Sequence, residues 1–211
     1  MICIDVDAMV KLAHWRILDE LPNIVGLPWH DCATLFSLGF RAKRSLNSPD
    51  KKLFHSEAAA TTVYEVTQRM SQLNQEIDES LLAELESARG IDAGEAVLLS
   101  NVIHGENNKL ITGDKRAIHA LSKLPLKDHF FGKIIILEQV ILASLIQHGD
   151  KWLLERICPY RDLDISVKIS LGSQCNSVDR EIRKALASYI NEIDVLCHPS
   201  LLSPLNTNPL S

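Results

Sequence analysis

The chain of 211 residues has few aromatic residues, few glycines and no surplus of basic residues. Phe, Trp and Tyr make up 5% of the sequence, and 9 residues are glycine. Lys and Arg number 22 against 27 Asp and Glu, which gives a formal net charge of −5. A protein that binds nucleic acid mainly through charge carries a basic surplus, so this class is disfavoured. A nuclease is not excluded, because divalent cations in a pocket of carboxylates present positive charge to a phosphate.

The sequence also lacks paired cysteine motifs, a signal-like segment and a long hydrophobic run. Its five cysteines have no C-x-x-C spacing, which predicts thiols in a reducing compartment and a cytoplasmic protein. They are Cys3, Cys32, Cys158, Cys175 and Cys197. The longest apolar run, residues 134–146, is interrupted by Glu138 and Gln139 and is too short to span a bilayer. Asp5 and Asp7 break any signal-peptide core, so we expect no membrane partner.

The spacing of apolar residues alternates between strand and helix patterns in the first part of the chain and is helical afterwards. Strand-like runs lie at residues 1–5, 23–27, 109–112 and 133–137. Helical spacing lies at residues 6–20, 30–46, 57–73, 79–88, 92–104, 114–121, 139–148, 151–157 and 178–195. The β-α-β alternation predicts a parallel sheet covered by helices over residues 1–140. We expect a helical extension at 141–197 and a disordered tail at 198–211.

Three acids are placed so that they can meet at one edge of this sheet. Asp5 closes the first predicted strand, and Asp114 follows the strand at residues 109–112. The carboxyl ends of parallel strands share an edge, where open α/β sheets bind their ligands. Glu95, in the first turn of the helix leading into the later strand, can reach the same edge. Three close carboxylates cannot all stay ionised without a cation, and oxygen ligands of this kind suit Mg²⁺ or Mn²⁺.

Most of these acids also have an ordinary structural interpretation. Asp92 and Glu95 have the spacing of a capping box, and Asp114 is placed to cap the helix that follows it. Asp7 is interpreted as a cap rather than as a ligand. For Glu95, capping and metal binding are compatible, since a site at a helix N-terminus uses both. Asp5 is different, because an acid that closes an apolar strand has no local backbone role.

Three segments resemble the PIN-domain family. The segment I-D-V-D-A-M-V-K-L at residues 4–12 resembles the opening strand and helix of that family. The segment G-I-D-A-G-E-A-V-L-L at 90–99 resembles the D-x-G-E-A helix start of one branch. The segment L-I-T-G-D-K-R-A-I at 110–118 resembles its late strand and T-x-D-K-R turn. The resemblance covers residues 1–140, which are therefore interpreted as a PIN-like domain.

The resemblance implies a three-layer α/β/α fold and the hydrolysis of single-stranded RNA phosphodiesters with Mg²⁺ or Mn²⁺. By that analogy Asp5, Glu95 and Asp114 are the catalytic acids and hold the metal. Thr112 would position the acidic turn or a water. If the chain is of the toxin type, an antitoxin-like protein is expected as a partner in addition to RNA.

The sequence departs from the family pattern at one further acid. The family has another acid on the helix after its second strand, where this chain has no glutamate. Asp31 is the nearest replacement and is taken as a fourth metal ligand, with Glu57 and Glu65 as alternatives. If none of them reaches the pocket, activity is expected to be weak or lost. The alternative function is therefore a non-catalytic PIN-like module that binds RNA or a protein partner.

Basic residues near these motifs could contact RNA. Lys115 and Arg116 follow Asp114 and could meet a phosphate, although Arg116 could equally face water. The run R-A-K-R at residues 41–44 could follow an RNA backbone or form a solvated helix end. A small phosphorylated ligand is a more distant alternative, disfavoured because no glycine-rich loop follows the first strand.

The last predicted helix carries an apolar stripe. Its members are Ile182, Leu186, Tyr189, Ile190 and Ile193. A stripe of this kind either packs on the core or joins two protomers, so a homo-oligomer is one of the two expectations.

Overall fold

The chain is an α/β protein in a computed structural model that describes residues 1–48, 50, 52–73, 78–197 and 200–205. Its strands are β1 (Ile2–Ile4), β2 (Cys32–Ala33), β3 (Lys109–Thr112) and β4 (Ile134–Ile136). Its α-helices are α1 (Val6–His14), α2 (Leu21–Val25), α3 (Phe36–Asn47), α4 (Glu57–Thr67), α5 (Glu79–Ser87), α6 (Ala93–Ile103), α7 (Lys115–Leu121), α8 (Leu137–His148), α9 (Asp150–Ile157), α10 (Ile165–Ser170) and α11 (Asp179–Cys197). Short 3-10 helices are η1 (Leu18–Glu20), η2 (Trp29–Asp31), η3 (Pro125–Phe130) and η4 (Cys158–Leu163).

The four described strands run parallel in one sheet, in the order β2-β1-β3-β4. β1 pairs with β2 on one side and with β3 on the other, where Ile4 lies opposite Ile111. The chain therefore crosses from one side of β1 to the other between β2 and β3. In an open sheet, the carboxyl ends of the two strands at such a reversal form the usual ligand site. The predicted parallel sheet is confirmed.

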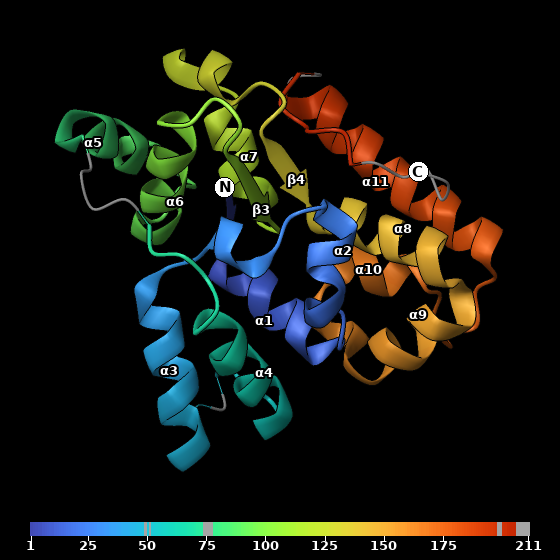
Figure 1. The fold of residues 1–211 in the computed structure, drawn as a ribbon. Coiled ribbons are helices and arrows are strands. Elements are labelled where there is room, and N and C mark those ends of the chain that lie inside the picture. The colour runs from blue at the N-terminus through green and yellow to red at the C-terminus, as the bar shows by residue number, and fades with distance from the viewer. Residues whose placement is uncertain (49, 51, 74–77, 198–199, 206–211) are drawn as a thin grey trace.

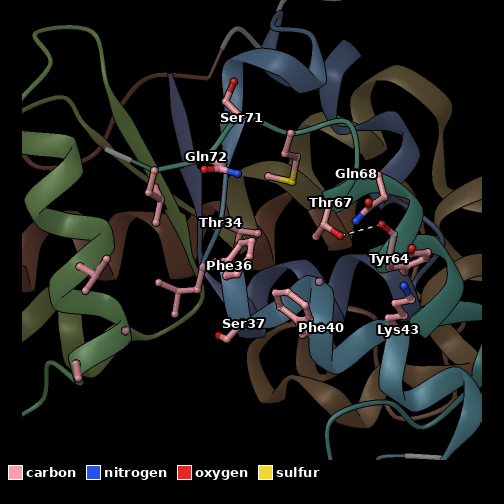
Figure 2. A pocket seen from close by; sticks show the side chains of 17 residues that line it. Thr34, Phe36, Ser37, Phe40, Lys43, Tyr64, Thr67, Gln68, Ser71 and Gln72 are labelled. Carbon is pink, nitrogen blue, oxygen red and sulfur yellow. Dashed lines mark hydrogen bonds between the residues drawn. The ribbon is translucent and has the colours of Figure 1, made fainter. Parts of the chain in front are cut away.

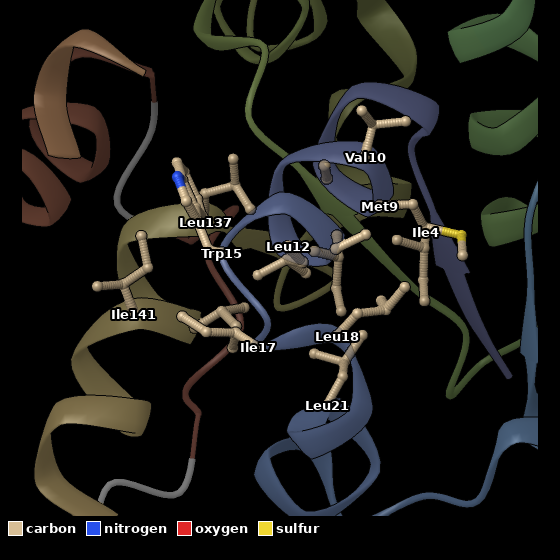
Figure 3. Close-up of a cluster of buried hydrophobic side chains, with 14 of the residues drawn as sticks. Ile4, Met9, Val10, Leu12, Trp15, Ile17, Leu18, Leu21, Leu137 and Ile141 are labelled. Carbon is tan, nitrogen blue, oxygen red and sulfur yellow. The ribbon is translucent and has the colours of Figure 1, made fainter. Parts of the chain in front are cut away.

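Helices cover both faces of the sheet, because successive strand side chains point to opposite sides. Ile2 and Ile4 belong to a buried cluster that includes side chains of α1 and α8. Figure 3 shows Ile4 close to Met9 and Leu12 of α1, with α8 beyond them. Cys3 points the other way, into a second cluster formed with α6 and α7. In Figure 1 these two pairs of helices accordingly flank the strands.

The segment before α3 differs from the sequence prediction. The strand predicted at residues 23–27 is wrong, because residues 23–25 form the end of α2 and Gly26 caps it. Pro22 lies in the first turn of α2, and Gly26 ends it in the left-handed conformation with φ +72°. A proline at the start and a glycine just past the end are helix signals, which here outweigh a short apolar run. β2 is a different segment of two buried residues, and α3 begins only at Phe36.

The helical extension predicted at residues 141–197 packs on the same core as the sheet. Ile141 of α8, and Ile182 and Leu186 of α11, are buried in the cluster that contains β1. Ile182 and Leu186 of the predicted α11 stripe therefore pack on the core of the same chain. The short helix α10 was not predicted. Among the described helices, none combines the length and the apolar character that crossing a bilayer demands.

The segment predicted as a disordered tail differs from that prediction in its described part, residues 200–205. The backbone N–H of Ile134 donates to the carbonyl of Leu201 at 3.1 Å. The N–H of Ser203 donates to the carbonyl of Ile134 at 2.6 Å. These residues thus continue the sheet beyond β4, and the remainder of the predicted tail lies outside the described residues.

Two of the five cysteines form a disulfide. Cys158 of η4 is bonded to Cys175, which precedes α11. Cys3, Cys32 and Cys197 are buried thiols. The prediction that all five are thiols is wrong, because the turn through η4 and α10 brings together two cysteines that are 17 residues apart. The thiol pattern therefore no longer indicates a reducing compartment.

Candidate active site

A cleft of about 620 Å³ lies at the carboxyl edge of the sheet. Asp5 follows β1 and Asp114 follows β3, the two strands at which the strand order reverses. α6 leads into β3 and so begins at this same edge, where its first turn contributes Glu95. All three predicted acids line the cleft. Its other charged lining residues are Asp7, Lys11, Asp92, Lys115, Arg116 and Asp164.

Asp5 is almost wholly enclosed, with 9% of the residue exposed. Its backbone N–H donates to the carbonyl of Ile111 at 2.9 Å, which fixes it at the end of β1 beside β3. It occupies the N-cap position of α1, where the backbone N–H groups of Val6 and Ala8 favour its ionised form and lower its pKa, although no capping hydrogen bond of standard geometry forms. Burial raises the pKa of Asp5 to about 6, and the charges of Asp7 and Asp92 add to the rise. A carboxyl group kept where ionisation is costly is typical of a functional site.

Glu95 is held by the predicted capping box at the start of α6, which is confirmed. Its N–H donates to Asp92 Oδ1 at 2.8 Å, and the N–H of Asp92 donates to Glu95 Oε2 at 2.8 Å. Burial raises the pKa of Glu95 to about 7, although the hydrogen bond from Asp92 opposes the rise. The charges of Asp114, Asp92 and Asp5 raise it further. Glu95 therefore caps its helix and also experiences the field of the other acids of the cleft.

The turn after β3 is built to present Asp114. Thr112 Oγ1 accepts a hydrogen bond from the N–H of Asp114 at 3.0 Å, which is one of the two roles expected of Thr112. A Cβ at position 113 would lie 2.6 Å from Leu137 Cδ1. Gly113 therefore allows the turn to pack directly against α8.

Asp114 is already engaged in the turn that it begins. Its Oδ1 accepts from the N–H groups of Arg116 at 2.7 Å and Ala117 at 3.2 Å, and its Oδ2 pairs with Arg116 Nη2 at 2.7 Å. Burial acts to raise the pKa of Asp114, but the hydrogen bonds from Arg116 and Ala117 hold it below its ordinary value. The Arg116 side chain is 86% exposed, so this pair lies at the mouth of the cleft.

Lys115 is turned toward the helical extension. Its Nζ lies 2.6 Å from Glu138 of α8 and 4.8 Å from the ring centroid of Tyr189 on α11. Glu138 is 2% exposed and also accepts a hydrogen bond from Ser166 at 2.5 Å. Of the two basic residues expected to meet a phosphate, Arg116 is therefore the more accessible one.

Lys11 also lines this cleft, a position that was not predicted from the sequence. Lys11 Nζ lies 2.7 Å from Asp7 and 3.0 Å from Asp164. Burial acts to lower the pKa of Lys11, but these two carboxylates raise it above its ordinary value. The i, i+4 spacing of Asp7 and Lys11 could have indicated the first pair. Asp164 comes from the extension, and no local pattern connects it to this edge.

Asp31, the predicted fourth ligand, lies at the opposite edge of the sheet. It immediately precedes β2, and Cys32 of β2 lies opposite Ile2 at the start of β1. The prediction placed a strand before Asp31, whereas the strand follows it, so its position does not support a role in the cleft. Glu57 and Glu65 are exposed on α4 and are not among the described lining residues either.

The acids of the cleft supply carboxylate oxygens, the donor atoms that Mg²⁺ and Mn²⁺ prefer. Asp5 and Glu95 are buried carboxyl groups with raised pKa, and within the described residues neither forms an ion pair. In that same part of the chain, no three His, Cys, Asp or Glu side chains are grouped so that they could hold a metal as they stand. Asp114 is paired with Arg116, so its use as a metal ligand would require it to give up that contact.

Comparison of the chain with family models, with curated proteins and with solved structures gives no match. Function is therefore inferred from the cleft itself.

Proposed function

We propose that the chain is a PIN-like, metal-dependent endoribonuclease that hydrolyses single-stranded RNA. The observation that carries this proposal is the shared cleft of Asp5, Glu95 and Asp114 at the carboxyl edge of the parallel sheet. Two of these acids are buried and have a raised pKa, as expected for carboxylates placed together for a function. Helices on both faces of the sheet are compatible with the three-layer fold of that family.

In this proposal Asp5, Glu95 and Asp114 hold Mg²⁺ or Mn²⁺. The bound ion supplies a Lewis acid for the phosphodiester and lowers the pKa of a water. The residues around it have separate tasks. Thr112 and Gly113 fix the turn that presents Asp114. Arg116 lies at the mouth of the cleft, where a substrate phosphate could replace Asp114 as its partner and leave Asp114 free to bind the ion.

The test is cleavage of end-labelled single-stranded RNA by the wild-type protein with Mn²⁺. Asp5→Asn keeps the shape of the side chain and removes its charge, so it should abolish cleavage, and a chelator should do the same to wild type. Asp31→Asn is the matched control, since Asp31 lies at the other edge of the sheet. All three proteins are purified in parallel, because a contaminating nuclease would survive the substitution. Equal cleavage by wild type and Asp5→Asn would contradict the proposal.

A non-catalytic PIN-like module that binds RNA or a protein is the second candidate. It is favoured by the position of Asp31 away from the cleft and by the contact of Asp114 with Arg116. Wild type that binds Mn²⁺ but cleaves none of a varied set of RNAs would support this candidate. A toxin-type role would add an antitoxin-like protein partner to either function.

A further inference from the structure

We propose that the groove between α3, α4 and α6 binds unpaired bases of the RNA strand whose phosphate lies in the acidic cleft. The identity of the ligand as RNA rests on the proposed function. The groove has a volume of about 1120 Å³ and is distinct from the cleft of Asp5. It is called the base groove below.

Two exposed aromatic side chains mark the base groove. Phe36 is 70% exposed and Phe40 is 60% exposed, and both line the groove. Their ring centroids are 4.7 Å apart in an edge-to-face arrangement. Exposed aromatic rings are the surfaces on which proteins stack single-stranded bases, because every base has a π-face. Figure 2 shows both rings on the side of α3 that faces the groove.

A lysine lies on the same face of α3 as the two phenylalanines. The positions i, i+4 and i+7 form one stripe along a helix, and here they are Phe36, Phe40 and Lys43. Lys43 Nζ lies 5.9 Å from the ring centroid of Tyr64 on α4, so a third aromatic ring and a charge close this end of the groove. The stripe thus offers stacking surfaces next to a cation for the backbone phosphate.

The polar lining of the base groove suits base edges rather than another cation. Gln68 and Gln72 are exposed amides, which both donate and accept hydrogen bonds. Thr67 Oγ1 donates to the carbonyl of Tyr64 at 2.8 Å, which leaves its oxygen able to accept. Among the described lining residues there is one lysine and no carboxylate, although the chain as a whole carries a net charge of −5. The described lining therefore presents one positive charge and no negative charge to an anionic strand.

The base groove and the acidic cleft meet at the first turn of α6. Ala93 and Gly94 line the groove, whereas Asp92 and Glu95 of the same turn line the cleft. A strand that crosses this turn can place bases against α3 and the next phosphate at the acids. This continuity, with the charge of Lys43, favours a nucleic acid over a protein as the occupant.

The test measures affinity for a labelled single-stranded RNA of twelve nucleotides by fluorescence anisotropy with Mn²⁺. Asp5→Asn serves as the parent so that the RNA stays intact during the measurement. Phe36→Ala/Phe40→Ala should weaken binding by about tenfold or more. Lys43→Gln should weaken it less and reduce its salt dependence. The matched controls are Phe131→Ala and Lys184→Gln, which lie outside the groove and should bind like the parent.

An abasic oligomer with the same sugar-phosphate backbone separates stacking from charge. The parent should bind the abasic oligomer about as weakly as Phe36→Ala/Phe40→Ala binds RNA. The double substitution should leave the affinity for the abasic oligomer unchanged. Sedimentation velocity on the same proteins tests the other occupant, a second copy of the chain. If the double substitution dissociates a dimer and leaves RNA affinity unchanged, the base groove is a protein interface and the inference is overturned.

Cleavage by otherwise wild-type protein separates this inference from the proposed function. If wild type cleaves RNA but the double substitution leaves affinity unchanged, only the base groove is refuted. If wild type does not cleave, yet the substitutions weaken RNA binding as expected, the base groove stands and the catalytic proposal fails. A parent that binds no RNA overturns the base groove whatever the cleavage result.

Discussion

Replacing Asp5 by asparagine should stabilise the metal-free protein at neutral and alkaline pH while it removes the proposed function. The Asp5 carboxyl group is buried beside Asp7 and Asp92, so its ionised form is disfavoured in the folded state. Asparagine occupies nearly the same volume and carries no charge. Residues that serve a function at a cost in stability often show this trade-off.

The size and the pH window of this effect follow from the pKa of Asp5. Folding raises it from 3.8 to about 6, a difference worth about 3 kcal/mol at about 1.4 kcal/mol per unit. Because the folded state holds this proton more tightly than the unfolded state, the wild type loses stability as pH rises through this range. The free energy of unfolding that wild type loses through Asp5 is less than about 1 kcal/mol at pH 4 and reaches its full value of about 3 kcal/mol above pH 7. Glu95 should add to the gain in stability of the variant, because the charge of Asp5 no longer repels its carboxylate.

The assay is urea denaturation with a chelator present, at pH 4 and at pH 8. The gain in free energy of unfolding for Asp5→Asn over wild type should be about 2 kcal/mol larger at pH 8 than at pH 4. Asp31→Asn is the control, because the Asp31 side chain is 47% exposed and the residue lies away from the cleft. An Asp5→Asn variant whose gain is the same at both pH values would refute the argument that this carboxyl group is held at a cost.

Three further predictions concern the metal, the disulfide and the buried ion pair. Mn²⁺ should raise the melting temperature of wild type with increasing concentration, and Asp114→Asn should remove most of that rise; an unchanged response would place the ion elsewhere. Cys158→Ser should lower the free energy of unfolding by about 3 kcal/mol in non-reducing buffer, as expected when a disulfide closes a loop between cysteines 17 residues apart. The stability of this variant should not change when a reductant is added. Lys11→Met should cost about 3 kcal/mol, because it leaves the largely buried Asp164 carboxylate without its cation. In the matched control, Lys168→Met breaks an exposed pair with Asp162 and should cost less than about 1 kcal/mol; equal costs would contradict the importance of burial.

The sequence sufficed for features that depend on neighbouring residues. Asp5 and Asp114 could be placed at one sheet edge because each directly follows an apolar strand, and Glu95 because it begins a helix that leads into the next strand. The capping box of Asp92 and Glu95 is a local pattern and was confirmed. Parallel pairing followed from the alternation of strands and helices.

Features that depend on distant parts of the chain were not predictable. β2 is two residues long, which is too short to show a periodic pattern. Because this strand was not recognised, the prediction put Asp31 at the wrong edge of the sheet. The contact between Lys11 and Asp164 spans 153 positions, and the sequence shows no pattern for it. The disulfide depends on the path of the chain through η4 and α10. The exposure of Phe40 could not be predicted either, because an apolar residue in an amphipathic helix is expected to face the core.

The most direct test of the acidic cleft as a metal centre is a crystal grown or soaked with Mn²⁺, with diffraction data collected at the manganese absorption edge. We expect an anomalous peak in the cleft, with carboxylate oxygens of Asp5, Glu95 and Asp114 as ligands of the ion and Arg116 turned away from Asp114. A peak only at another site, or no peak in the cleft at saturating Mn²⁺, would contradict the assignment.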